Sequence, residues 1–176
     1  MSSRFRPRLM SNVSKAPTPE HGAMTSLEVK VPPPAVALLV GLLMWFASRG
    51  VASVEAPFEA RVGVAAVLAS LGLAFGGAAM LSFVRARTTM NPTKPGTSSS
   101  LVTDGVFRLT RNPMYLSLVL YLLGWAAYLS NWLALLLVPM FVLYINELQI
   151  KPEESALSAL FGAEYASYKT RVRRWL

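Results

Sequence analysis

The chain has 176 residues, of which 53% are hydrophobic and 15% are charged, and its mean hydropathy is +0.43. A water-soluble globule would have difficulty covering so much apolar surface, so the composition favours a membrane protein. The chain has no cysteine, which excludes disulfides, thiolate metal sites and a cysteine nucleophile. The chain has a formal charge of +8, and its basic residues lie beside apolar segments. This pattern is typical of cytoplasmic loops and of contact with anionic lipid headgroups, so we expect no nucleic-acid partner. We also expect no bound metal.

Residues 1–30 are polar, interrupted by prolines and without hydrophobic periodicity. We expect a flexible cytoplasmic tail, and the lack of an apolar core directly behind its basic residues argues against a cleaved signal peptide. The one histidine of the chain, His21, lies in this tail, which disfavours catalysis by histidine. Residues 31–176 are predicted to form a single membrane domain.

Four apolar runs follow, at about Pro34–Ser48, Val62–Val84, Pro113–Leu129 and Trp132–Ile150. A membrane-spanning helix needs about 20 residues, with about 17 as the lower limit, so the second and fourth runs are long enough and the third just qualifies. The first run is short unless it continues past Arg49. Because β-barrel alternation is absent, all four are predicted to be transmembrane helices. Only Ser130 and Asn131 separate the last two, which predicts an antiparallel helical hairpin.

Basic residues gather on one side of the predicted spans. They precede the first span, lie between the second and third, and follow the fourth. The opposite side carries little more than Arg49 and Arg61, offset by Glu55 and Glu59. Because cytoplasmic loops are enriched in Lys and Arg, both termini and the middle loop are predicted to be cytoplasmic.

The stretch TRNPMY, residues 110–115, stands at the start of the third apolar run. Asn is a favoured N-cap and Pro is favoured at the first helical position, so Asn112 and Pro113 predict a helix start. The free amides of such a start suit a carboxylate or phosphate. Arg111 and Tyr115 are not needed for it, and they are interpreted either as site residues or as headgroup-level anchors.

A second polar cluster, INELQIKPEESALSALFGAEYASYKTRVRRWL, ends the chain. Pro152 predicts another helix, with Glu153 and Glu154 in the first turn, where carboxylates suit the helix dipole. Apolar residues at three- and four-residue steps predict a cytoplasmic amphipathic helix that lies on the bilayer or on the span ends. The stripe comprises Leu157, Leu160, Phe161, Tyr165 and Tyr168, and the arginines Arg171, Arg173 and Arg174 are interpreted as interfacial anchors.

The segment LVTDGVFRLTRNPMYLSL and the later EE..AL...FG.EY..YK.RVRRWL together resemble the isoprenylcysteine carboxyl methyltransferase and phospholipid methyltransferase superfamily, in particular its small bacterial members. The resemblance covers about residues 85–176, which would form the cofactor-binding part. It implies an integral enzyme of a bacterial inner membrane that uses S-adenosylmethionine on the cytoplasmic side. A lipophilic small molecule or lipid would accept the methyl group.

The resemblance places the cofactor on two stretches of the chain. Eukaryotic members have histidine where this chain has Asn112, and either side chain can cap a helix and donate a hydrogen bond. The paired carboxylates would meet the cationic end of the cofactor or its ribose. The implied cofactor-binding residues are Ser100, Leu101, Val102, Phe107, Asn112, Pro113, Met114, Tyr115, Glu153 and Glu154.

Glu147 bears on the identity of the methyl acceptor. It stands where relatives often carry an arginine that holds an acidic substrate. A glutamate there would repel a carboxylate, which favours an amine or neutral acceptor. The alternative is an ion pair between Glu147 and Lys151, one helical turn away. The predicted catalytic residues are Glu147, Glu154 and Arg111, with the carboxylates as proton acceptors.

The sequence leaves two other classes of protein open. One is a membrane reductase of the sterol-reductase type, which would use a nicotinamide cofactor. The other is a non-catalytic, lipid-binding membrane protein, which accounts for the helix starts and the charges but not for the arrangement of both motifs together. Binding of S-adenosylmethionine or of reduced nicotinamide would separate the three.

Overall fold

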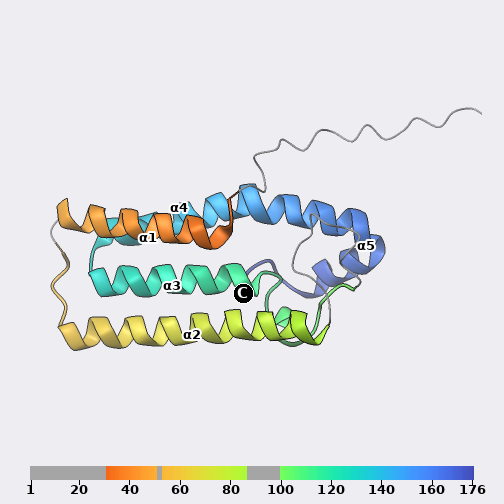
Figure 1. The fold of residues 1–176 in the computed structure, drawn as a ribbon, viewed down its shortest axis with the longest axis horizontal. Coiled ribbons are helices and arrows are strands. Elements are labelled where there is room, and N and C mark those ends of the chain that lie inside the picture. The colour runs from red at the N-terminus through yellow and green to blue at the C-terminus, as the bar shows by residue number, and fades with distance from the viewer. Residues whose placement is uncertain (1–30, 51–52, 87–99) are drawn as a thin grey trace, which may run out of the picture.

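The computed structural model describes residues 31–50, 53–86 and 100–176 (Figure 1). The predicted tail, with His21, and most of the middle loop lie outside the described residues. All regular elements in the described part of the chain are helices, and the predicted all-α architecture with four apolar helices is confirmed. The elements are α1 (Pro33–Gly50), α2 (Phe58–Arg85), the 3₁₀ turn η1 (Gly105–Arg108), α3 (Pro113–Leu129), α4 (Trp132–Ile145), the π-helical segment η2 (Asn146–Ile150) and α5 (Lys151–Arg171).

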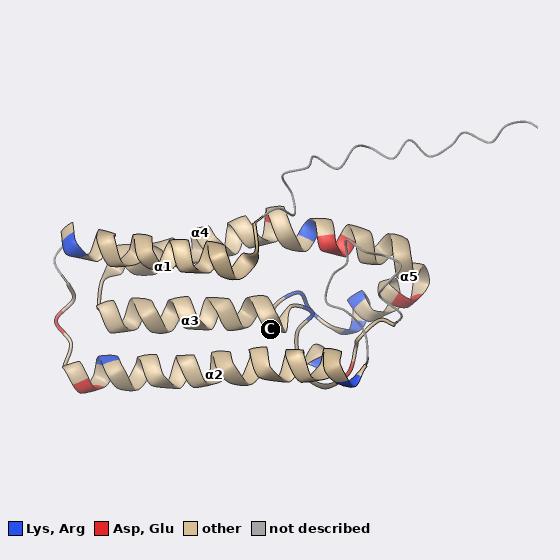
Figure 2. Ribbon diagram, in the orientation of Figure 1, with Lys and Arg blue, Asp and Glu red and all other residues tan. Residues whose placement is uncertain are grey.

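The helices α1, α2 and the continuous path from α4 into α5 are long and apolar enough to cross a membrane, and α3 is a shorter apolar helix of 17 residues. The first helix is longer than the apolar run because it continues through Arg49 to Gly50. Figure 2 shows the charged residues at the two ends of the bundle and none along its middle, as a hydrocarbon layer requires.

Helices α2 and α3 pack closely through small residues. A Cβ atom on Gly72 would lie 3.0 Å from the ring of Tyr121 and 3.1 Å from the carbonyl oxygen of Ser117. At the other end of the contact, a Cβ on Gly124 would lie 3.2 Å from the carbonyl oxygen of Ala65. Small residues allow this approach, which provides the van der Waals packing that holds helices together in lipid.

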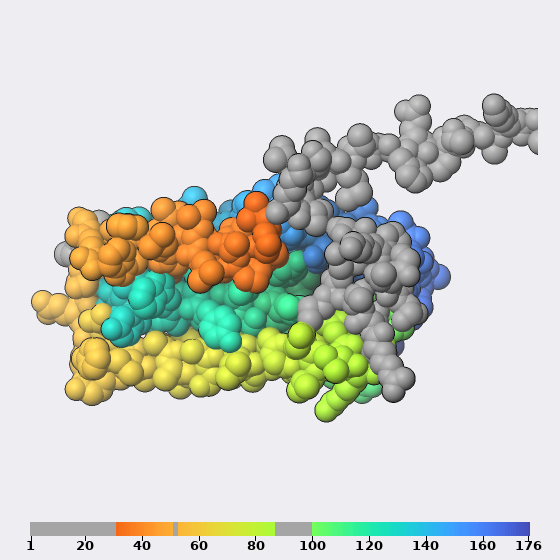
Figure 3. Space-filling model, in the orientation of Figure 1, coloured from red at the N-terminus to blue at the C-terminus, as the bar shows by residue number. Residues whose placement is uncertain are grey.

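Helix α1 covers α3 and α4, and Figure 3 shows α1, α3 and α2 stacked in that order on one face. The shared core includes Met44, Leu122 and Phe141. The indole Nε1 of Trp125 donates to the carbonyl oxygen of Gly41 over 3.0 Å, which joins α3 to α1. The predicted hairpin between α3 and α4 is present, and Oδ1 of Asn131 caps α4 by accepting from two backbone amides.

The path from α4 to α5 differs from the sequence prediction. A separate helix was expected to start at Pro152, but helical backbone continues from Trp132 to Arg171 through η2. A proline is tolerated there because the π-helical turn already interrupts the regular hydrogen-bond ladder that its missing N–H would otherwise break. Farther on, Gly162 has φ 49° and ψ −118°, and α5 turns back at this residue. Residues 172–176 therefore return toward the start of α3 (Figure 1).

Candidate functional site

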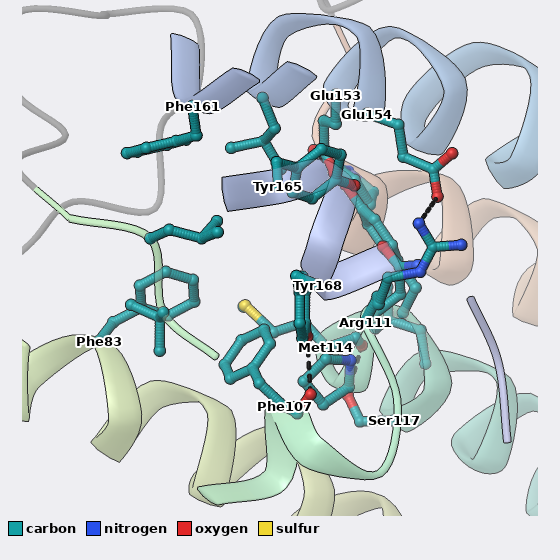
Figure 4. Close-up of a pocket in the computed structure, with 18 of the residues that line it drawn as sticks. Phe83, Phe107, Arg111, Met114, Ser117, Glu153, Glu154, Phe161, Tyr165 and Tyr168 are labelled. Carbon is teal, nitrogen blue, oxygen red and sulfur yellow. Dashed lines mark hydrogen bonds and ion pairs between the residues drawn. The ribbon is translucent and has the colours of Figure 1, made fainter. Parts of the chain in front are cut away.

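A cavity of about 370 Å³ lies at the end of the bundle where α3 begins (Figure 4). Its walls come from the start of α1, the end of α2, segment 100–112, the first turns of α3, and α5 along most of its length. The volume falls in the range of small-molecule sites. Every residue expected to bind the cofactor lines this one cavity, although binding itself stays a prediction: Ser100, Leu101, Val102, Phe107, Asn112, Pro113, Met114, Tyr115, Glu153 and Glu154.

The start of α3 is where the sequence predicted it, but Asn112 does not act as a side-chain cap. Its Nδ2 instead donates to the carbonyl oxygen of Arg174 over 3.0 Å. Oγ1 of the buried Thr110 donates to the same oxygen, also over 3.0 Å, and accepts from the Asn112 amide. The carbonyl oxygen of Arg174, in segment 172–176, thus takes the Asn112 side chain that would otherwise cap α3. The amides of Met114 and Tyr115 therefore receive no cap from Asn112.

Two arginines converge on Glu154. Arg174 donates to both carboxylate oxygens, from Nε to Oε1 over 3.0 Å and from Nη2 to Oε2 over 2.7 Å. Arg111 approaches the same Oε1 with its Nη1 at 3.1 Å. The Glu154 side chain is only 16% exposed, so this cluster is held largely out of water. Charge-assisted pairs of this fork geometry are among the stronger and more directional hydrogen bonds in proteins.

Arg111 keeps unused donors in the cavity wall. Its side chain is 12% exposed, and its Nε and Nη1 are buried without a hydrogen-bond partner in the part of the chain that the structure describes. Proximity to Glu154 supplies charge compensation but no well-aligned bond. A buried guanidinium with unpaired N–H groups is costly, and an anionic group in the cavity would satisfy it.

Glu153, next to Glu154, has a different environment. Its Oε1 accepts from the hydroxyl of Tyr115 over 2.5 Å. Burial raises the pKa of Glu153 from 4.5 to about 7, the Tyr115 hydrogen bond partly opposes this rise, and the charge of Glu154 adds to it. Adjacent carboxylates thus present one group neutralised by guanidiniums and one group close to titration at neutral pH.

The rest of the cavity is apolar. Phe83 of α2 and Phe107 of η1 meet edge to face with ring centroids 5.4 Å apart. Leu157 and Phe161 of α5 lie on the same cluster, so part of the stripe predicted for α5 faces the cavity. The hydroxyl of Tyr168 donates to the carbonyl oxygen of Phe107 over 2.6 Å and fixes α5 over η1 (Figure 4).

Glu147 is not brought together with these residues. It does not line the cavity, and its Oε2 lies 2.5 Å from Nζ of Lys151, with both side chains more than half exposed. This is the ion pair that the sequence offered as the alternative. The structure therefore gives no support to the argument for an amine acceptor that rested on Glu147.

Phe83, which lines the cavity, and Arg174, which holds Glu154 from beside it, carry no local signal in the sequence. Phe83 belongs to an ordinary apolar helix, and Arg174 follows Arg171 and Arg173 in a basic run that reads as a set of membrane anchors. Arg174 reaches the site because the kink at Gly162 turns the chain back. The position of Arg174 beside Glu154 therefore depends on the tertiary structure and not on the local sequence.

The fold defines a helical integral membrane protein with a cavity at one end of its bundle. The family model described as phospholipid methyltransferase matches residues 58–164, and the chain belongs to this family, whose members are S-adenosylmethionine-dependent membrane methyltransferases.

Two relatives are similar over part of the chain. An uncharacterized protein of Haemophilus influenzae is 56% identical over 63 residues, which are 36% of this chain and all of that protein. The protein-S-isoprenylcysteine O-methyltransferase of Schizosaccharomyces pombe is 32% identical over 72 residues, which are 41% of this chain and 30% of that protein. The chain thus spans less than a third of the yeast enzyme. No solved structure matches.

Proposed function

We propose that the protein is an S-adenosylmethionine-dependent methyltransferase that acts on a lipophilic acceptor in the membrane. The observation that carries this proposal is the cavity in which the unpaired donors of Arg111, the Glu153 carboxylate and an apolar wall lie together. Membership of the phospholipid methyltransferase family supports it.

The residues present fit the chemical groups of the cofactor. S-adenosylmethionine carries a carboxylate, an ammonium and a sulfonium on one side, and an adenine ring on the other. Arg111 and the uncapped amides of α3 suit the carboxylate, and Glu153 suits the ammonium or the ribose. Phe83, Phe107 and Phe161 form a wall on which an aromatic ring can pack.

When bound, the cofactor would supply an electrophilic methyl group for transfer to a lone pair of the acceptor. The contribution of the chain is alignment and exclusion of water. The ion pairs of Arg111 and Arg174 with Glu154 hold one wall, and the Tyr168 hydroxyl holds the opposite wall against Phe107.

We propose an amine or a neutral nucleophile as the acceptor, reached from the apolar side of the cavity. With Glu147 outside, the preference depends on Glu153, which no guanidinium engages in the described part of the chain and whose pKa is raised to about 7 by burial. A carboxylate near titration at neutral pH suits that task. The cavity end of the bundle would face the cytoplasm, which agrees with the basic residues around it (Figure 2).

Binding and turnover test the proposal. Protein purified in detergent should retain labelled S-adenosylmethionine but not reduced nicotinamide. With the methyl-labelled cofactor, it should methylate a long-chain amine faster than a carboxylic acid of the same chain length. Retention of the nicotinamide alone would favour a reductase and refute the proposal. A faster reaction with the acid would refute only the proposed acceptor class.

A further inference from the structure

Segment 172–176 is fastened to the start of α3 by its backbone. The Arg111 amide donates to the carbonyl oxygen of Arg173 over 3.0 Å. The side chains of Thr110 and Asn112 both donate to the carbonyl oxygen of Arg174 over 3.0 Å. These bonds fix where the Arg174 side chain begins, directly beside the cavity.

From this position Arg174 engages Glu154 through a two-bond fork, at 3.0 and 2.7 Å. Both oxygens of the carboxylate are thereby occupied. Arg111, which lies 3.1 Å from one of them, is left with buried donors that have no aligned acceptor among the described residues. A guanidinium and a carboxylate at this separation pair in the same fork geometry when nothing else holds the carboxylate.

We propose that Arg174 is a positioning residue of the cofactor site: by holding Glu154, it keeps the donors of Arg111 available to an anionic group of the cofactor. The inference rests on the proposed function. Removing Arg174 would free both oxygens of Glu154, and Arg111 would turn to them instead of to the ligand.

The neighbouring arginine provides a matched control. Arg173 carries the same charge on the same segment, but its side chain is exposed and only its backbone carbonyl is used in the contact with Arg111. Arg173→Gln therefore removes one positive charge near the site and retains the fork on Glu154. A general loss of basic charge would affect both variants equally, whereas positioning through Glu154 would affect only one.

The test measures the Kd for S-adenosylmethionine and the thermal midpoint in the full chain. We expect Arg174→Gln to weaken cofactor binding about tenfold, the scale of a lost charge-assisted hydrogen bond, and to raise KM with kcat within about twofold. Arg174→Lys keeps the charge but loses the fork, so it should recover part of the affinity. Arg173→Gln should bind like the wild type.

A double-substitution cycle decides whether Arg174 acts through Glu154. In a Glu154→Gln background, Arg174→Gln should cause little further loss of affinity, because the group it positions is already neutral. Two outcomes would overturn the inference without refuting the proposed function. One is an equal loss of cofactor affinity on Arg174→Gln in both backgrounds, and the other is an equal loss of affinity on substitution of Arg173 and of Arg174. Wild-type protein that retains no cofactor would refute the proposed function and this inference together. If Arg174→Gln does not fold, the same cycle is run with Arg174→Lys, and unchanged affinity would be the refuting result.

Discussion

The hydroxyl of Tyr115 donates to Oε1 of Glu153 over 2.5 Å and joins the start of α3 to the first turn of α5. The neighbouring Glu154 is held by two arginines. Two carboxylates that are consecutive in sequence thus differ in their partners, one a neutral phenol and the other a pair of cations. Burial, with the charge of Glu154 beside it, raises the pKa of Glu153 to about 7 against the opposing effect of the Tyr115 hydrogen bond, so the charge of Glu153 changes near neutral pH.

Cofactor affinity should therefore depend on pH. Burial raises the pKa of Glu153 from 4.5 to about 7, so the folded protein holds this proton more tightly than the unfolded chain. The resulting contribution to stability is present below about pH 4.5 and is lost as pH rises to about 7. Binding of the cationic end of S-adenosylmethionine prefers the ionised form, so affinity should rise over the same range. Calorimetric titration at several pH values measures it.

The matched variants for this pH dependence lie on one helix. Glu153→Gln should weaken binding and remove the pH dependence near 7. Glu164→Gln, at an exposed position of α5, should keep it. A pH dependence that survives Glu153→Gln would assign the titration to another group.

Asn112 should matter more for the cofactor than for folding. Its side chain does not cap α3 but holds the Arg174 carbonyl, so Asn112→Leu removes one hydrogen bond and should cost about 0.5–1.5 kcal/mol of stability. The free energy of cofactor binding should change by more than this stability loss, because the lost hydrogen bond fixes segment 172–176, which carries Arg174. Asn112→His retains a donor and should bind nearly as the wild type. Equal losses for Leu and His in cofactor affinity would contradict this role.

The close contact of α2 with α3 predicts that the stability of the protein depends strongly on side-chain size at Gly72. Gly72→Ala would place a methyl group 3.0 Å from the Tyr121 ring and 3.1 Å from the Ser117 carbonyl, which should destabilise the protein by about 1–3 kcal/mol. Gly77 is on the same helix with nothing within 4 Å of its Cβ position. Gly77→Ala should therefore be neutral or slightly stabilising, and unfolding in detergent compares the two. Similar effects at both positions would argue against this packing.

The basic residues predict the orientation in the membrane. Reporters fused at residues 20 and 176 should both respond as cytoplasmic, and one inserted near Ala56 should respond as external. The reason is the excess of Lys and Arg at the cavity end of the bundle (Figure 2), together with the basic residues of the middle loop and the N-terminal segment in the sequence. Opposite readings at residues 20 and 176 would mean an odd number of spans and refute the arrangement.

The helices were predictable because their information is local. Apolar runs of about 20 residues must become helices in lipid, where each backbone amide needs a partner within its own segment. The two residues between α3 and α4 leave no alternative to a hairpin. The residues that line the cavity were indicated by resemblance of two separate motifs, and the fold brings both motifs to one place.

The partners within the site were decided by the tertiary structure. The sequence by itself determined the apolar helices, the start of α3 at Pro113 and the positions of the two glutamates. It did not determine that Glu147 points to Lys151, outside the cavity, or that Arg174 reaches Glu154. Those outcomes depend on the π-helical segment η2, which changes the rotation of α5 relative to α4, and on the turn at Gly162, which returns the chain to α3. Ion pairs form between whichever charges the fold brings within a few ångströms, and that distance is set by the path of the whole chain.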